Sequence, residues 1–138
     1  MKRIILVFAA AAVLGAFAAP HAVAGNPHFV GSRSCTFSES TGNLTCSFKV
    51  AGLGNATQAT VQLVFPFGCI NRGGNIPPGQ ASTNPVTVPV RNGQITLENF
   101  TFTTNASCPD QMRSFAGPVA TLFVNGVEVG TIPITNTT

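Results

Sequence analysis

Apolar and polar residues alternate along much of this chain, which is the pattern of half-buried β-strands. From Leu44 to Val50 the even positions are apolar and most odd positions are polar, so one face of this segment should point into a core. The same period of two predicts a strand over residues 60–69 whose apolar face ends at Cys69. Helix formers in amphipathic register are absent, and the pattern therefore predicts an all-β domain.

Turn signals separate the alternating segments. The polar hexapeptide at 38–43 predicts a hairpin that joins the strand at 44–50 to a preceding strand around Cys35 and Phe37. The Asn-Gly pairs at 92–93 and 125–126 are the strongest short hairpin signals in a sequence. We therefore expect consecutive strands to be joined by tight turns.

Details of the remaining segments refine this pattern. Pro89 lies within the apolar segment 86–90 and indicates an edge strand. The apolar positions change parity between Leu97 and Phe100, which predicts a β-bulge near Glu98 and Asn99. Residues 119–124 are apolar on both faces, as a central strand can be.

Two long loops and a polar end complete the chain. Residues 70–84 and 105–114 are rich in turn-forming residues, and residues 135–138 form a polar tail after a last strand that starts at Val127. The remaining segments amount to about seven strands with turn signals at regular spacing, which predicts an antiparallel β-sandwich or a barrel.

The first 24 residues have the order of a secretory signal. Two cations at Lys2 and Arg3 precede an apolar run from Ile4 to Ala19, and small residues follow it. We expect cleavage after Ala24, with a cut near Ala18 as the alternative. An uncleaved anchor is disfavoured because the run is shorter than the roughly 20 residues that span a bilayer. Residues 25–138 are then a single exported domain, and no further membrane span is expected after cleavage.

Charge argues against nucleic acid as a partner. The precursor carries a formal charge of +3, but two of its cations belong to the signal. The exported part has a net charge of +1, from five cations and four carboxylates: Arg33, Lys49, Arg72, Arg91, Arg113, Glu39, Glu98, Asp110 and Glu128. A nucleic-acid binder needs a basic stripe that neutralises phosphates, and these scattered cations do not form one.

Four cysteines, Cys35, Cys46, Cys69 and Cys108, lie in the exported part. An even number in an oxidising compartment predicts two disulfides, and four cysteines permit three pairings. We favour Cys35–Cys46 with Cys69–Cys108. Cys35 and Cys46 should both point inward from the two arms of the predicted hairpin. The long spacings between the four cysteines and the lack of a CxxC sequence argue against a metal site.

Several motifs of the exported part are similar to those of a group of uncharacterised secreted bacterial proteins. They are Gly25-Asn26-Pro27-His28-Phe29, the glycine turn at 51–54, Cys69 to Asn75, and Ser107-Cys108-Pro109. The resemblance covers most of the exported chain. It implies an immunoglobulin-like sandwich and a disulfide at Cys69–Cys108, and it implies no activity. A looser similarity exists to the apoproteins of secreted enediyne antibiotics, which are small two-disulfide sandwiches that carry an apolar ligand.

The best candidate for a binding feature is the loop sequence 71–75. Its members are Asn71, Arg72, Gly73, Gly74 and Asn75. Paired glycines can turn backbone amides outward, and an arginine adds a fork of donors. The alternative, which the ordinary use of glycine favours, is a tight turn beside a disulfide. Asp110 and Arg113, from the second loop, complete the candidate binding loop.

Catalytic and metal sites are not indicated. No G-x-S-x-G sequence is present, and His28 is the single histidine of the exported part, so no cofactor or metal is expected. Asp110 with Glu98 is the one carboxylate pair that could be tested for glycosidase geometry. His28 is better interpreted as a polar residue at the start of a strand.

The sequence predicts a secreted, non-enzymatic domain that binds an extracellular protein or a surface polymer. Its contact surface would be the loop at 70–84 or the threonine-rich strand faces. Two alternatives stay open. The first is a protease inhibitor that presents residues 108–113 with Met112 or Arg113 at the tip of the loop, and the second is a carrier of a small apolar ligand.

Overall fold

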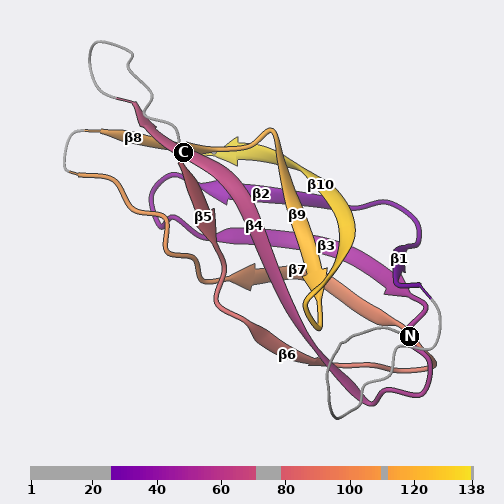
Figure 1. The fold of residues 1–138 in the computed structure, drawn as a ribbon. Coiled ribbons are helices and arrows are strands. Elements are labelled where there is room, and N and C mark those ends of the chain that lie inside the picture. Colours follow the sequence, from indigo (N-terminus) through magenta and orange to yellow (C-terminus); the bar gives the residue numbers. More distant parts are fainter. Residues whose placement is uncertain (1–25, 71–78, 110–111, 138) are drawn as a thin grey trace.

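Ten β-strands and no helix make up the described part of the chain (Figure 1). The structure is a computed structural model that describes residues 26–70, 79–109 and 112–137, and the predicted signal segment 1–24 lies outside them. None of the described residues belongs to a helix that could cross a membrane. The strands are β1 (His28–Phe29), β2 (Ser34–Ser38), β3 (Leu44–Ala51), β4 (Gln58–Ile70), β5 (Gln80–Ser82), β6 (Val86–Pro89), β7 (Ile95–Phe102), β8 (Arg113–Ala116), β9 (Val119–Val124) and β10 (Val127–Thr137).

The first layer is built around β3. One edge of β3 pairs first with β2 and then, further along the same edge, with β1. The other edge pairs with β7, and all three pairings are antiparallel. The predicted hairpin at 38–43 is confirmed, because β2 and β3 are joined there and Cys35 lies directly opposite Cys46. We refer to β1, β2, β3 and β7 as the first sheet.

The second layer is built around the long strand β4. It pairs with β9 and β8 along one edge and with β6 and β5 along the other, and β10 lies beyond β9. Two expectations are confirmed here. The strand that contains Pro89 pairs with β4 alone and lies at an edge, and β9 is central, between β10 and β4. We refer to this layer as the second sheet.

Strand β10 connects the two sheets. Its first part pairs antiparallel with β9, and its last residues, 134–137, pair with β2 in parallel. The sheet is therefore mixed, and the segment expected to be a polar tail is a paired strand as far as Thr137. Its polar side chains concealed this, because one face of the segment is open to solvent. Thr83, which follows β5, forms a β-bridge with Thr104, which follows β7, and this bridge links the two sheets at a second place.

The two Asn-Gly turns form, and the first has an unexpected consequence. Asn92 and Gly93 have φ angles of 53° and 75°, and Asn125 and Gly126 have 51° and 81°, as a two-residue hairpin loop requires. The second turn joins two paired strands, β9 and β10. The first does not, because β6 pairs with β4 and β7 pairs with β3. This turn carries the chain from the second sheet to the first.

The predicted bulge is confirmed, and two predicted loops are shorter than expected. Residues 98 and 99 of β7 together face Ser47 of β3, and Asn99 has a φ of 50°. Residues 80–82 of the predicted loop 70–84 form strand β5 on the edge of β4. The predicted loop 105–114 gives way to β8 at Arg113. Both strands are short and pair through their backbones, so that hydrophobic alternation gave little signal for them.

Inward-facing residues of both sheets form one core. The largest fully buried side chains come from both layers: Phe37, Phe65, Phe102, Leu44, Leu53, Leu63, Ile95, Leu122, Ile132, Val50, Val61 and Val124. Two polar residues are buried among the described residues, Ser114 and, more completely, Thr83. The Thr83 hydroxyl accepts the backbone N–H of Leu63 at 3.0 Å, so its burial leaves this group paired.

Both predicted disulfides are present. The hairpin disulfide, Cys35–Cys46, joins opposite residues of β2 and β3 with a Cα–Cα distance of 4.1 Å, and both cysteines are buried. The loop disulfide, Cys69–Cys108, joins the end of β4 to the segment before β8 and is half-buried. Two disulfides are consistent with an oxidising compartment.

Candidate functional site

A row of four threonines crosses the outer face of the first sheet. Thr101 of β7 lies opposite Thr45 of β3, Thr45 lies opposite Thr36 of β2, and Thr36 lies beside Thr135 of β10. Most of their neighbours in the strands are buried or half-buried, because side chains alternate along a strand. The row therefore lies entirely on the solvent side. Three of its members are exposed and Thr45 is half-buried.

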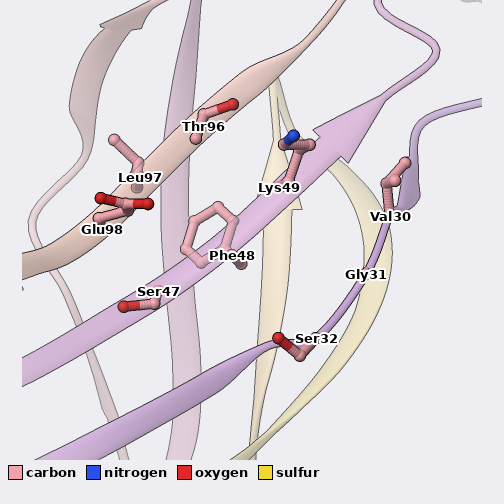
Figure 2. A pocket seen from close by; sticks show the side chains of 9 residues that line it. All are labelled: Val30, Gly31, Ser32, Ser47, Phe48, Lys49, Thr96, Leu97 and Glu98. Carbon is pink, nitrogen blue, oxygen red and sulfur yellow. The ribbon is translucent and has the colours of Figure 1, made fainter.

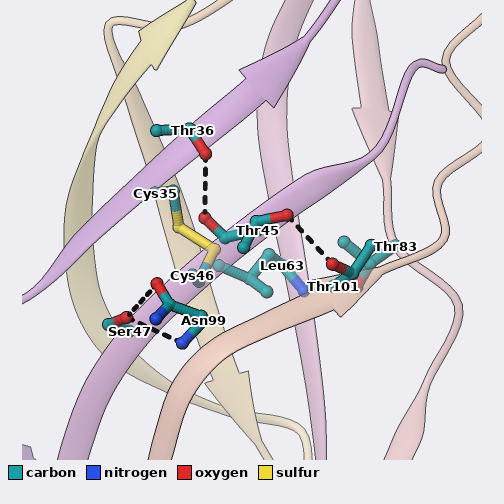
Figure 3. Close-up of a disulfide and its surroundings, with 9 residues drawn as sticks. All are labelled: Cys35, Thr36, Thr45, Cys46, Ser47, Leu63, Thr83, Asn99 and Thr101. Carbon is teal, nitrogen blue, oxygen red and sulfur yellow. Dashed lines mark hydrogen bonds between the residues drawn. A yellow bond between two sulfur atoms is a disulfide. The ribbon is translucent and has the colours of Figure 1, made fainter.

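Hydrogen bonds fix the centre of this row (Figure 3). The hydroxyl groups of Thr45 and Thr101 are 3.0 Å apart, and the Thr36 hydroxyl donates to the Thr45 carbonyl at 3.5 Å. At the bulge, the Ser47 hydroxyl accepts the backbone N–H of Asn99 at 2.9 Å. These bonds hold the side chains of three adjacent strands in a common arrangement.

Neighbouring positions extend the row into a polar face without charge. Ser34 lies opposite Ser47 on one side of the row, and Ser38 lies beside Thr137 on the other. We call this surface the hydroxyl face; it consists of Ser34, Thr36, Ser38, Asn43, Thr45, Ser47, Asn99, Thr101, Thr135 and Thr137. Each hydroxyl can both donate and accept a hydrogen bond, so the face offers many uncharged partners at the regular spacing of a sheet.

A shallow hollow lies at one end of the hydroxyl face (Figure 2). It has a volume of about 300 Å³ and lies between the segment that follows β1, the end of β3 and the start of β7. Its lining contains one cation, Lys49, and one carboxylate, Glu98. The other lining residues are hydroxyl-bearing, apolar or glycine: Val30, Gly31, Ser32, Ser47, Phe48, Thr96 and Leu97.

Most of the candidate binding loop lies outside the described residues. This holds for 71–75 and for Asp110. Arg113 is described, and it is the first residue of β8, opposite Ile70 of β4. Its guanidinium donates to the Glu39 carboxylate, with a nitrogen–oxygen distance of 3.1 Å. This hydrogen bond and the negative charge of Glu39 raise the pKa of Arg113 above its ordinary value.

The ion pair ties β8 to the hairpin that joins β2 and β3. The hydroxyl of Ser114 donates to the Glu39 carbonyl at 3.2 Å and supports the same contact. The Arg113 side chain is 70% exposed, against 18% for Glu39, so solvent screens the pair and it contributes little to stability. Arg113 is thus a strand residue engaged by a partner and does not lie at the tip of a loop.

The described carboxylates and the histidine are distributed over separate elements. Glu39 follows β2, Glu98 lies in the β7 bulge, and Glu128 follows the turn between β9 and β10. Within residues 26–70, 79–109 and 112–137 no three His, Cys, Asp or Glu side chains gather into a metal site. His28 begins β1, as expected, and its Nδ1 lies 2.9 Å from the Asn26 carbonyl oxygen.

The sequence contained part of the signal for the hydroxyl face. The outward parity of Thr36, Thr45 and Thr101 follows from the alternation of their strands. Their alignment in one row depends on the register of three strand pairs, and Thr135 joins the row only because β10 changes sheets. Comparison with protein families, with curated proteins and with solved structures finds no match for the chain, so its resemblance to a secreted bacterial group stays a prediction.

Proposed function

We propose that this chain is an exported, non-catalytic binding domain that contacts a hydroxylated surface polymer through the hydroxyl face. The observation that carries the proposal is the row Thr101, Thr45, Thr36 and Thr135 across four adjacent strands. The signal-like N-terminus supports export, and the two disulfides support a life in an oxidising compartment.

The size and chemistry of the face suit a polymer. From Asn43 to Ser47 the face extends four residues along β3, or about 13 Å, and four strands give it a width of about 14 Å. Uncharged hydroxyl and amide groups offer no complementary charge to a polyanion such as nucleic acid. They can exchange hydrogen bonds with the hydroxyl groups of a neutral polysaccharide over the whole area. Because each bond contributes little net free energy, many must form together.

The other two candidate functions have less support. An inhibitor loop should project its contact residue, whereas Arg113 is paired within β8 and bonded to Glu39. A carrier of an apolar ligand needs an enclosed apolar cavity. Among the described residues, the hollow at Lys49 is open and partly polar. The described buried side chains of both sheets belong to one hydrophobic cluster.

Co-sedimentation with insoluble polymers tests the proposal. The exported protein is mixed with cellulose, chitin or purified bacterial cell walls, and the bound fraction is measured. A Thr36→Val/Thr101→Val variant removes two hydroxyls of the row and keeps residues that favour strands. The matched control is Thr60→Val/Thr87→Val, an exposed threonine pair on the outer face of the second sheet.

The proposal expects binding to at least one polymer, a loss of tenfold or more in the Thr36/Thr101 variant, and no loss in the control. It is refuted if none of the polymers sediments the wild-type protein. Equal losses in the two variants would refute the assignment of the contact to the hydroxyl face.

A further inference from the structure

We propose that the hollow between Lys49 and Glu98 is a subsite for a zwitterionic group about as long as a dipeptide. The proposal rests on the proposed function and adds to it, because such a group would be a substituent of the bound polymer. It assigns a role to the hollow at the end of the hydroxyl face.

The two charges have a defined relation in the sheet. Lys49 lies directly opposite Thr96, and Glu98 is two residues further along β7. Lys49 and Glu98 are therefore diagonal neighbours on one face, with a separation of about 7–8 Å at their bases. Side chains stand roughly perpendicular to a sheet, so a similar separation of the charged ends is within reach of both side chains.

Lys49 and Glu98 do not neutralise each other. The ion pair found among the described residues joins Arg113 to Glu39, and neither Lys49 nor Glu98 forms a salt bridge with a described residue. The space between them is the hollow (Figure 2). A cation and an anion on neighbouring strands in the lining of one hollow are complementary to a ligand that carries both signs.

Charge and length select the ligand class. A simple anion would be attracted by Lys49 but repelled by Glu98. A simple cation would be attracted by Glu98 but repelled by Lys49. A zwitterion satisfies both charges when its own charges are about as far apart as theirs. Two extended residues span about 7 Å, so a dipeptide has the required separation. Hydroxyl groups of Ser32 and Thr96 lie in the lining and can bond the central amide.

NMR titration with three small probes tests the subsite. Glycylglycine carries both charges, N-acetylglycylglycine carries only the carboxylate, and glycylglycine amide carries only the ammonium. Glycylglycine should shift the amide signals of residues 47–49 and 96–98 in a saturable manner. The affinity of each single-charge analogue should be lower than that of glycylglycine by a factor of about ten or more, and a factor of ten corresponds to about 1.4 kcal/mol.

Charge variants then identify the groups responsible. Lys49→Gln and Glu98→Gln should each remove the preference for glycylglycine over the analogue that lacks the matching charge. Glu128→Gln, which changes an exposed carboxylate in the hairpin between β9 and β10, is the control and should bind like wild type. The exchange Lys49→Glu/Glu98→Lys restores both signs in reverse positions and should recover the preference for the zwitterion.

Equal affinities for the three probes, or no saturable shift, would overturn the subsite. So would a loss of binding in Glu128→Gln equal to that in Glu98→Gln. These results are separable from failure of the polymer proposal. Polymer binding that depends on Thr36 and Thr101, without glycylglycine binding, removes the subsite alone. Glycylglycine binding without polymer binding leaves a dipeptide site and removes the polymer role.

Discussion

Replacing Asn136 with alanine should destabilise the protein through two lost hydrogen bonds. The Asn136 side chain accepts the backbone N–H of Ala116 at 2.8 Å and donates to the carbonyl of the same residue at 2.7 Å. It thus takes the place of a neighbouring strand on the outer edge of β8. Ala116 is 3% exposed, so water cannot readily replace the lost partners.

The backbone N–H and carbonyl of Ala116 form no hydrogen bond with β4. Ala116 lies opposite Phe67 of β4, but the Phe67 N–H donates to the Gly79 carbonyl on the β5 side. The N–H that donates to β4 here is that of Gly117, which bonds the Pro66 carbonyl. In the alternating ladder of antiparallel strands, Ala116 therefore points its N–H and carbonyl away from β4. Two hydrogen bonds at about 0.5–1.5 kcal/mol each give a loss of about 1–3 kcal/mol. For a domain of this size the Tm should fall by roughly 4–12 °C.

Thermal unfolding of three variants measures this effect. Asn136→Asp keeps an acceptor for the Ala116 N–H but offers no donor to its carbonyl, so it should be destabilised as well. Asn84→Ala removes an exposed asparagine side chain for which the described residues provide no hydrogen bond, and its Tm should hardly change. The reasoning is refuted if Asn136→Ala unfolds at the same temperature as Asn84→Ala.

Four further predictions concern stability and the disulfides. Gly42→Ala should lower the free energy of unfolding clearly more than Gly126→Ala, which should cost roughly 1–2 kcal/mol. Both glycines have positive φ, but only at Gly42 would a Cβ lie 2.5 Å from the Ala106 carbonyl oxygen. Equal shifts in urea midpoint would contradict this. The half-buried loop disulfide should be alkylated before the buried hairpin disulfide under mild reduction, as read by mass spectrometry, and the reverse order would contradict the burial argument. Removing the loop disulfide should lower the free energy of unfolding by about 4 kcal/mol, and removing the hairpin disulfide by about 3 kcal/mol, for sequence separations of 39 and 11. The opposite ranking in chemical denaturation would contradict this. Leu122→Ala, at a fully buried position of β9, should cost about 2–5 kcal/mol, and a loss below 1 kcal/mol would show that the site is not well packed.

Local patterns predicted the strands whose two faces differ. The alternation in β3 and β4, the bulge at Glu98 and Asn99, and the tight turns all depend on residues close together in the sequence. The pairing of Cys35 with Cys46 followed for the same reason, since a hairpin brings its two arms together. These features needed no knowledge of the rest of the chain.

Long-range pairing was not predictable in the same way. The turn at Asn92 and Gly93 forms, but its flanking strands belong to different sheets, because β6 pairs with β4 and β7 pairs with β3. Residues 135–137 look like a tail, and only the free edge of β2 makes them a strand. The hydroxyl face depends on this pairing. A sequence could therefore supply its threonines but not their alignment.

Chemical-shift mapping with a soluble oligosaccharide tests the central claim most directly. The oligosaccharide is taken from the polymer that sediments the protein, and shifts of backbone amides are followed as it is added. The account predicts saturable shifts that cluster at 34–38, 43–49 and 96–101, across the outer face of the first sheet. Shifts that cluster instead at 60–64 and 119–123, on the second sheet, would contradict it.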